Sequence, residues 1–193
     1  MKLSQVFLGV AGALWVLGSA QAASNVAPLG TASQSSIYDS RDASRANDGN
    51  TDGNYYDNSV QHTQSSVGYA VGNGNEWWQV ALDKSYTVES ITIWNRTDCC
   101  TDRLRDFTVS LFSGSTLEWS GVYFAGNGPL PSTTFSSIDK VGDRVLVQLN
   151  RQDYLHMAEV QVFASAVPEP ETYALMFAGL GVLGFVARRR NTV

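Results

Sequence analysis

The segment from Asn95 to Arg103 contains the only two cysteines of the chain, as neighbours, with an arginine on either side of them. Adjacent Cα atoms lie about 3.8 Å apart, whereas bridged cysteines normally need roughly 4.4 to 6.8 Å, so a bond between Cys99 and Cys100 would close a tight ring. Such a ring is rigid and apolar. Arg96 and Arg103 offer planar sets of N–H donors to hydroxyl oxygens. These features are typical of a loop that binds a sugar ring.

The same segment allows a plainer interpretation. Asp98 and Asp102 lie next to the arginines, so each guanidinium could be paired with a neighbouring carboxylate on a solvated loop. The cysteines could then be free thiols or could link two chains. Both interpretations stay open on this segment alone.

The start of the chain has the pattern of an export signal. Residues 1–22 contain Lys2, an apolar run, and the small residues Ala20 and Ala22 at the expected cleavage site of a secretory signal peptide. Outside the cytoplasm an oxidised cysteine pair is chemically reasonable, and two cysteines without a CxxC spacing argue against structural zinc. Export therefore favours a disulfide within the pair.

Residues 167–193 have the layout of a sorting signal. Pro-Glu-Pro at 168–170 is followed by an apolar segment at 173–187 and by three arginines at 188–190. At roughly 15 residues the apolar segment is shorter than the ~20 that span a bilayer comfortably, and the arginines would hold its end on the cytoplasmic side. This order resembles the PEP-CTERM signal of bacterial exported proteins, which implies transient membrane association and cutting by an exosortase-type processing enzyme. An ordinary tail anchor that stays uncut is the alternative.

The remaining residues, 23–166, suit a single domain with a sizeable core. The whole chain has 13 Lys and Arg against 18 Asp and Glu, which gives a formal net charge of −5. An acidic surface repels polyanions, so this balance disfavours nucleic acid and anionic lipid as partners.

Strands dominate this domain. Short segments rich in β-branched and aromatic residues are separated by clusters of Gly, Asn, Asp and Ser. They are Trp77 to Leu82, Val88 to Trp94, Phe107 to Phe112, Arg144 to Leu149, and Glu159 to Ala164. Apolar and polar residues alternate in the last two, as in strands with one face in a core. We therefore predict an all-β protein, an antiparallel β-sandwich with its function carried by loops at one end.

The segment 45–54 is dense in oxygen donors and glycine. Its sequence, Arg-Ala-Asn-Asp-Gly-Asn-Thr-Asp-Gly-Asn, has the composition that folds a loop around a hard cation. It does not complete an EF-hand, because Ser59 stands where the bidentate glutamate is needed and no flanking helices are expected. A polar turn without metal is the alternative.

Taken together, these segments resemble the F-type lectins, or fucolectins, of the discoidin-like (F5/8 type C) group. The signature Arg-x-Asp-x4-Arg falls on Arg96, Asp98 and Arg103, and the upstream histidine of the family falls on His62. The paired cysteines and the paired tryptophans at 77–78 also fit. The resemblance covers nearly all of residues 23–166 and implies an eight-stranded jelly-roll β-sandwich of the galactose-binding-domain-like kind.

The resemblance also implies a ligand, terminal L-fucose, bound by His62, Arg96 and Arg103 beside a vicinal disulfide between Cys99 and Cys100. Tyr55 and Tyr56, together with the disulfide ring, are expected to surround the C6 methyl group of the sugar. Asp98 is expected to orient the arginines without touching the sugar.

A bound calcium ion (Ca²⁺) is the cofactor that the resemblance implies. Carried over by position, its oxygen ligands are expected to lie in loop 45–59 and at the start of the last strand. They are the backbone oxygens of Arg45, Asn50 and Ala158, the side chains of Asp48 and Glu159, and Ser59. The ion would attach the loop to the sandwich, which is a structural role.

The sequence therefore predicts a calcium-containing lectin, not an enzyme, exported to the cell surface or extracellular matrix, with fucosylated glycans or polysaccharide as partners. Two other classes stay open. A structural matrix protein with a lectin-like frame is disfavoured by the retained His62, Arg96 and Arg103. A glycosidase needs a pair of carboxylates about 5 to 9 Å apart, and no nucleophile motif supports it.

Overall fold

Alternating apolar residues form strands with one buried face in this protein. In β8 (Lys140–Leu149) the side chains of Val145, Val147 and Leu149 are fully buried, and the residues between them are half-buried. Burial of this kind stabilises a fold by about 25 cal/mol for each Å² of apolar surface. The predicted antiparallel β-sandwich is confirmed, since the strand pairs of the described residues are antiparallel.

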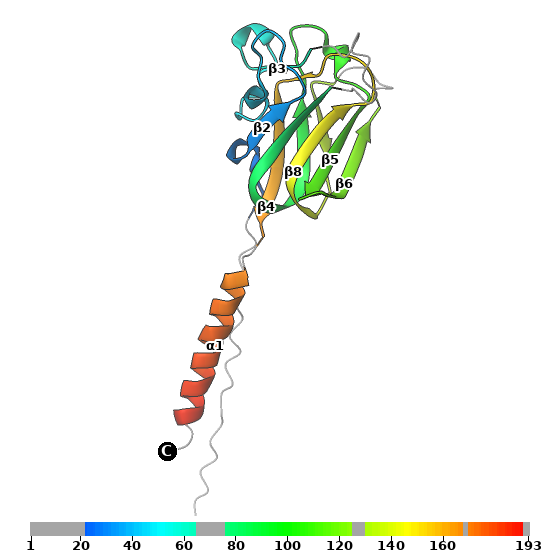
Figure 1. Cartoon of the computed structure of the whole chain (residues 1–193). Helices are drawn as coiled ribbons and strands as arrows, with labels where there is room; N and C mark the ends of the chain where they lie inside the picture. The colour runs from blue at the N-terminus through cyan, green and yellow to red at the C-terminus, as the bar shows by residue number, and fades with distance from the viewer. Residues whose placement is uncertain (1–21, 65–75, 125–129, 168–169, 191–193) are drawn as a thin grey trace, which may run out of the picture.

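The computed structural model describes residues 22–64, 76–124, 130–167 and 170–190 (Figure 1). Its other strands are β1 (Ser24–Asn25), β2 (Thr31–Gln34), β3 (Gln61–His62), β4 (Trp77–Trp94), β5 (Phe107–Ser113), β6 (Thr116–Tyr123), β7 (Ser132–Phe135), β9 (His156–Met157) and β10 (Glu159–Ala166). Short 3₁₀ helices are η1 (Ala27–Leu29), η2 (Ala43–Ala46), η3 (Tyr55–Asp57) and η4 (Thr101–Arg103). The predicted signal peptide, apart from Ala22, lies outside the described residues.

The long strand β4 belongs to both layers of the sandwich. Its first part pairs with β2 and, as far as Val88, with β8, and its second part, from Tyr86 onward, pairs with β10 and β7. One layer is therefore β2-β4-β8-β5-β6 and the other is β1-β10-β4-β7. These eight strands form one hydrogen-bonded sheet, as the jelly-roll resemblance implies, and β3 pairs separately with β9.

The sequence-based expectation of two separate strands over 77–82 and 88–94 is wrong. The chain stays extended through the exposed residues Asp83, Lys84 and Ser85, and its pairing with β8 shifts register there. Polar residues at this point mark the place where the strand passes from one layer to the other.

Trp78 is the largest fully buried side chain of the core. Its indole Nε1 donates a hydrogen bond of 2.9 Å to the backbone oxygen of Ala43, so the polar edge of the ring is satisfied inside the apolar cluster. The neighbouring Trp77 points to the other side of β4 and is half-buried. The bond to Ala43 attaches η2 to the sheet.

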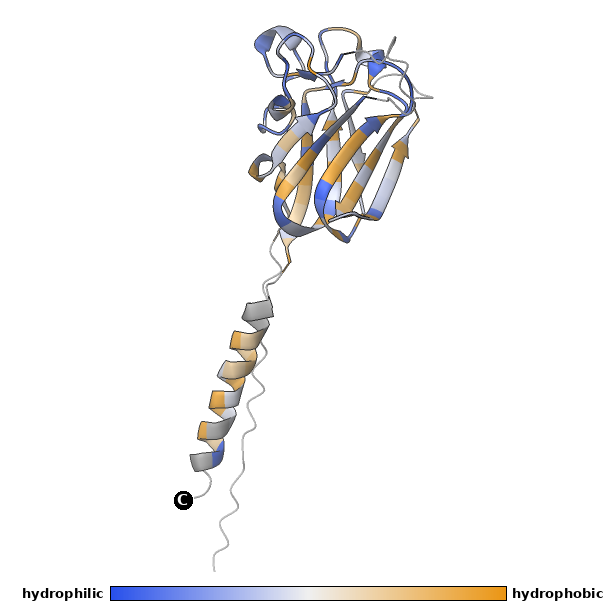
Figure 2. Cartoon of the chain, viewed as in Figure 1, coloured by the Kyte–Doolittle hydropathy of each residue, from blue (hydrophilic) through white to orange (hydrophobic). Residues whose placement is uncertain are grey.

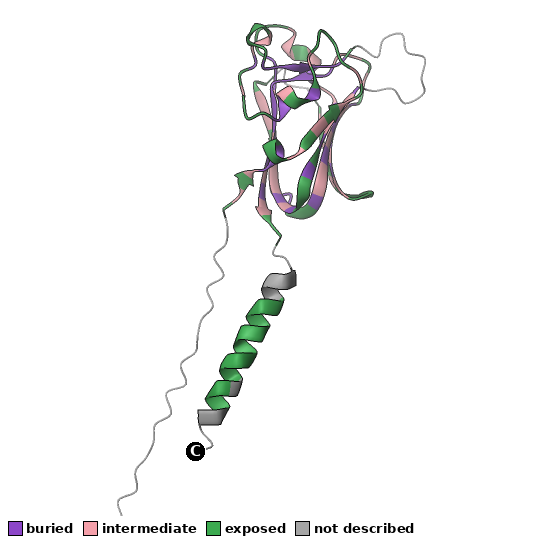
Figure 3. Cartoon of the chain, turned by 60° about the vertical axis from the view of Figure 1, so that its left-hand side comes forward, coloured by how far each residue is buried: buried purple, intermediate pink, exposed green. Residues whose placement is uncertain are grey.

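The two ends of the sandwich differ in character. The loops at the end that holds β3 are mostly hydrophilic, whereas the strands carry the apolar residues (Figure 2). The helix α1 (Pro170–Arg190) follows β10 at the opposite end (Figure 1). Its described side chains are exposed, including apolar ones such as Leu175 and Val182 (Figure 3). Among the described residues, no helix combines the length and the apolar character needed to cross a membrane.

Candidate functional site

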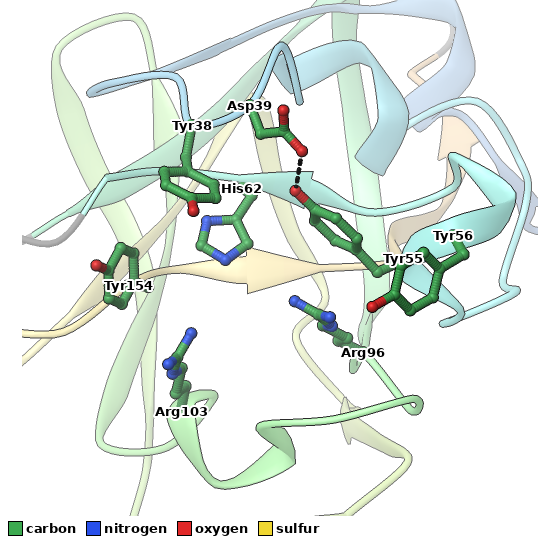
Figure 4. Close-up of a pocket in the computed structure, with 8 residues that line it drawn as sticks. All are labelled: Tyr38, Asp39, Tyr55, Tyr56, His62, Arg96, Arg103 and Tyr154. Carbon is green, nitrogen blue, oxygen red and sulfur yellow. Dashed lines mark hydrogen bonds between the residues drawn. The ribbon is translucent and has the colours of Figure 1, made fainter.

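A cavity of about 320 Å³ opens at the hydrophilic end of the sandwich (Figure 4). Its walls come from the loop after β2, from η3 and β3, from the segment that follows β4, and from the loop before β9. The lining residues are Tyr38, Asp39, Tyr55, Tyr56, His62, Arg96, Arg103 and Tyr154. The structure thus brings together five of the seven residues predicted to contact sugar, and Cys99 and Cys100 are not among the residues that line the cavity.

A ladder of side-chain caps shapes the loop that leads into η3. Each Asp or Asn at alternate positions accepts a hydrogen bond from the backbone N–H two residues further on. These bonds run from Asn50 to Asp48 (2.8 Å), from Asp52 to Asn50 (3.0 Å), from Asn54 to Asp52 (3.0 Å) and from Tyr56 to Asn54 (3.1 Å). The spacing of oxygen donors in the sequence therefore fixes the backbone that presents the two tyrosines.

Asp98 holds Arg96 in a bidentate ion pair. Its two carboxylate oxygens accept hydrogen bonds of 2.7 Å from Nε and Nη2 of Arg96, and Oδ1 also accepts one of 3.0 Å from the backbone N–H of Tyr55. The Arg96 hydrogen bonds, as the largest cause, lower the pKa of Asp98 to about 2. Arg96 is 7% exposed, so the pair supplies the counter-charge that a buried guanidinium requires.

Tyr55 lies between two guanidinium groups. The Cζ atom of Arg41 is 4.1 Å from the centre of its ring, and that of Arg96 is 4.2 Å from it. Its hydroxyl donates a hydrogen bond of 2.6 Å to Oδ2 of Asp39, the bond drawn in Figure 4. Desolvation, followed by this bond to Asp39, raises the pKa of Tyr55. The neutral ring therefore contacts both guanidinium groups and adds a second contact to the one that Asp98 makes with Arg96.

His62 presents one ring nitrogen to the cavity as an acceptor. Its Nδ1 lies 2.6 Å from the backbone oxygen of Thr63. A carbonyl can only accept, so Nδ1 carries the proton and Nε2 is left with a lone pair. Burial first, and then the charges of Arg96, Arg103 and Arg41, lower the pKa of His62 and keep the ring neutral.

Arg103 ends η4 and is held by different partners from Arg96. Its Nε atom is 4.0 Å from Oδ1 of Asp153, and its Cζ atom is 4.7 Å from the ring centre of Tyr154. The sequence-based expectation is that Asp98 orients both arginines, but its ion pair is with Arg96. The carboxylate next to Arg103 is that of Asp153, which lies far along the chain.

The cysteine pair shapes the turn between the two arginines. The Sγ atoms of Cys99 and Cys100 are in bonding contact, with Cα atoms 3.8 Å apart. Cys100 adopts a left-handed conformation with φ of 56°, which is uncommon for a residue with a side chain. This residue caps η4 and so directs Arg103 back toward the cavity.

The residues predicted to bind calcium lie at the start of β10 and in the chain from η2, which contains Arg45, to Ser59, just after η3. Glu159 is fully buried, and its Oε1 atom accepts a hydrogen bond of 3.1 Å from the backbone N–H of Gly49. Its Oε2 atom is buried without a partner, and desolvation raises the pKa of this carboxyl to about 8. Ser59 is also buried, and its hydroxyl donates to the backbone oxygens of Asp52 and Asn54.

This donor set fits a hard cation. One carboxylate oxygen of Glu159 is orphaned, the other accepts a hydrogen bond from the oxygen-rich loop at Gly49, and Asp48 lies near enough to act on the charge of Glu159. Within the described residues, no three or more His, Cys, Asp or Glu side chains gather in a metal-holding group. A set that depends mainly on backbone oxygens and two carboxylates is consistent with that finding.

Sequence reasoning did not find Tyr38, Asp39 and Tyr154 as cavity residues. They lie in loops, and no spacing rule connects them to the arginines. Packing brings them in, since the backbone N–H of Tyr38 donates to the oxygen of His62 at 2.9 Å. His156 is fully buried, and the centre of its ring lies 5.2 Å from that of His62.

Known proteins share this fold and sequence pattern. The family model of the NedA-like, galactose-binding domain matches residues 45–146, and the PEP-CTERM protein-sorting motif matches residues 166–190. Fucolectin-6 from Anguilla japonica is 35% identical over 150 residues, which cover 72% of this chain and 75% of that protein.

Two solved structures agree with this finding. A fucose binding module from Streptococcus pneumoniae matches with a TM-score of 0.65 at 31% identity, covering 73% of this chain and 95% of the module. The lectin domain of lectinolysin, complexed with Lewis B antigen, matches with a TM-score of 0.66 at 34% identity, covering 74% of this chain and 98% of that domain.

The fold and the cavity therefore define a sandwich of the galactose-binding-domain kind. The chain belongs to the NedA-like, F5/F8 type C-like family, among the F-type lectins or fucolectins, and it carries a PEP-CTERM motif. The resemblance seen in the sequence is confirmed.

The environment of His62 predicts its titration. Its folded pKa is below 6.5, so the unfolded chain takes up the proton first and His62 reduces stability as the pH falls from 6.5. We expect the imidazole signals of His62 to titrate below pH 6.5 in NMR spectra. In the Arg103→Ala variant the midpoint should rise, because one repelling charge is lost. A midpoint at or above 6.5 in the unaltered protein would contradict the assignment of a neutral ring.

Proposed function

We propose that this protein is a lectin that binds terminal L-fucose in the cavity formed by His62, Arg96 and Arg103. The observation that carries the proposal is the convergence of these three side chains on one opening, although His62 lies far from the two arginines in the sequence. The fucolectin and fucose-binding relatives support the choice of sugar.

The hydrogen-bonding groups of the cavity suit a neutral sugar. Nε2 of His62 accepts from one hydroxyl group, and the free N–H groups of Arg96 and Arg103 donate to ring and hydroxyl oxygens. Each hydrogen bond to a charged donor contributes about 1.5–3 kcal/mol. Because Arg96 already has its partners, little conformational entropy is lost when it meets the sugar.

The apolar part of the cavity distinguishes a deoxy sugar. Tyr56 is 83% exposed and lies beside Tyr55 at a ring distance of 6.0 Å, so it is free to cover a ligand. We propose that these rings surround the C6 methyl group, together with an oxidised Cys99–Cys100 ring that the sugar would reach beyond the residues that line the cavity. Burial of one such group contributes about 0.8 kcal/mol, which is a modest preference over galactose. Single sites should be weak, and clustering would supply avidity.

Binding accounts for the cavity better than catalysis does. Glycosidases use two carboxyl groups that flank the scissile bond. Among the described lining residues the carboxylate is Asp39, which accepts a hydrogen bond from Tyr55, while Asp98 is engaged by Arg96. A purely structural matrix role would not require two arginines and a neutral histidine to face one opening.

Titration calorimetry of the purified protein with L-fucose tests the function. We expect a millimolar to micromolar site, and Arg103→Ala should abolish it, because the cavity loses its half-exposed donor. Arg144→Ala is a matched control, since Arg144 also stacks on an aromatic ring, Phe112 at 4.0 Å, but does not line the cavity. Unaltered fucose binding by the Arg103 variant would remove that arginine from the mechanism.

We also propose that calcium is bound between the loop and β10. The residues that would hold it are the backbone oxygens of Arg45, Asn50 and Ala158, the side chains of Asp48 and Glu159, and Ser59. The cation would supply the counter-charge that the buried carboxylate of Glu159 lacks. Support comes from the orphaned Oε2 atom of Glu159 and from the oxygen-rich loop.

Thermal unfolding with and without a chelator tests the calcium proposal. Added calcium should raise the melting temperature, since a ligand at 100 times its Kd stabilises by about 2.7 kcal/mol. Glu159→Gln should remove this response, whereas Glu118→Gln, on an exposed position of β6, should keep it. Melting curves of the unaltered protein that ignore both chelator and calcium would overturn the proposal.

The C-terminal motif supports a proposal about the location of the lectin. We propose that the protein is exported, held briefly at the membrane by the segment that follows Pro-Glu-Pro, and cut there by an exosortase-type enzyme. Support comes from the match to the PEP-CTERM motif over residues 166–190. The product would reach the cell surface or extracellular matrix, where clustered sites cross-link fucose-bearing polysaccharide.

Mass spectrometry of protein recovered from the surface of the native host tests this processing. Peptides that contain Arg188 should be missing from the mature form. Replacement of Pro-Glu-Pro at 168–170 by alanines should trap the uncut, membrane-associated chain, whereas Glu171→Gln should not. Recovery of intact C-terminal peptides from the surface protein would indicate an ordinary tail anchor instead.

A further inference from the structure

A short segment, residues 153–156, forms the wall of the cavity between Arg103 and His62. It is attached to the strand that carries His62 by two hydrogen bonds of 2.9 Å. The backbone N–H of Thr63 donates to the oxygen of Leu155, and the backbone N–H of Leu155 donates to Oγ1 of Thr63. Leu155 is fully buried. The segment is therefore a fixed part of the site and not a mobile rim.

Tyr154 extends from this segment into the cavity (Figure 4). Its ring centre lies 4.7 Å from Cζ of Arg103 and 5.3 Å from the ring centre of His62, at an interplanar angle of 64°. A third contact, at 6.0 Å, joins it to Tyr38. One side chain thus touches two of the three polar groups that the proposed function assigns to sugar.

The two arginines of the cavity are held by devices of the same kind. Arg96 has a carboxylate, Asp98, and the face of Tyr55. Arg103 has a carboxylate, Asp153, and the face of Tyr154. The second device is looser, because its ion pair measures 4.0 Å against 2.7 Å and the Arg103 side chain is 33% exposed. Asp153 is also paired with Arg151, so its carboxylate is shared, and we expect the ring of Tyr154 to carry a larger share of the orientation of Arg103.

We propose that Tyr154 is a positioning residue of the sugar site. Its ring fixes the guanidinium group of Arg103 and holds the imidazole of His62 in place relative to that group. This inference rests on the proposed function for its effect on sugar, but the positioning itself exists without ligand. Asp153 supports the arrangement, since its Oδ1 atom accepts a hydrogen bond of 2.8 Å from the backbone N–H of Tyr154.

The test compares Tyr154→Phe with Tyr154→Leu in calcium-containing buffer. Tyr154→Leu should weaken fucose binding roughly three- to thirty-fold, the range of a partly desolvated cation–π contact, and Tyr154→Phe should restore it because the ring is kept. Tyr123→Leu is the matched control, since the Tyr123 ring stacks on Phe107 at 5.2 Å and does not line the cavity.

A second measurement needs no sugar. NMR signals of the His62 imidazole and of Arg103 Nε–H should move in Tyr154→Leu and stay near their original positions in Tyr154→Phe and Tyr123→Leu. If these signals and the affinity are unchanged in Tyr154→Leu, the inference is overturned. If Tyr154→Leu does not fold, Tyr154→Met serves in its place. Failure of the unaltered protein to bind fucose would defeat the proposed function, while the sugar-free NMR comparison still decides the positioning role.

Discussion

The carboxylate of Asp98 is the contact on which the arrangement of the cavity depends. It accepts two hydrogen bonds from Arg96 and one from the backbone N–H of Tyr55, so it joins the segment after β4 to the start of η3. Loss of this carboxylate would leave a guanidinium buried without a counter-charge, which typically costs several kcal/mol. Gly53 allows the two segments to approach this closely, because a Cβ atom at this position would lie 2.6 Å from the backbone oxygen of Asn95.

The proposed metal site and the cavity share a single structural base at the end of β4. Trp94 pairs with Glu159, and its backbone oxygen accepts a hydrogen bond of 2.9 Å from Ala158. Arg96 begins the cavity segment two positions later. The residues that would hold a cation are thus fixed to the same strand end as the residues that would hold a sugar. A change that loosens loop 48–54 should therefore weaken both cation binding and sugar binding.

The sequence predicts the polar centre of the site better than its walls. Arg96 and Arg103 follow from a family motif with fixed spacing, His62 follows from the histidine that lies upstream of that motif, and buried strands such as β8 follow from alternation. Asp39 and Tyr154 could not be predicted from local spacing. The pairing of β3 with β9 brings the loop of Tyr154 to the cavity, and the hydrogen bond from Tyr38 to His62 brings in the loop of Asp39. The two partners of Arg103 likewise depend on a contact that spans some fifty residues of chain, for which local spacing carries no signal.

The direction of β10 gives the molecule two functionally different ends. The strand begins at Glu159, beside the cavity loops, and ends at Ala166, next to the PEP-CTERM motif. At about 3.3 Å per residue, a strand of this length separates its ends by roughly 25 Å. β1 pairs with the late part of β10, with Ser24 opposite Ala164, so both ends of the domain leave from the side away from the cavity. A chain held through its C-terminal segment would therefore present the cavity outward, toward glycans that lie beyond the surface that holds it.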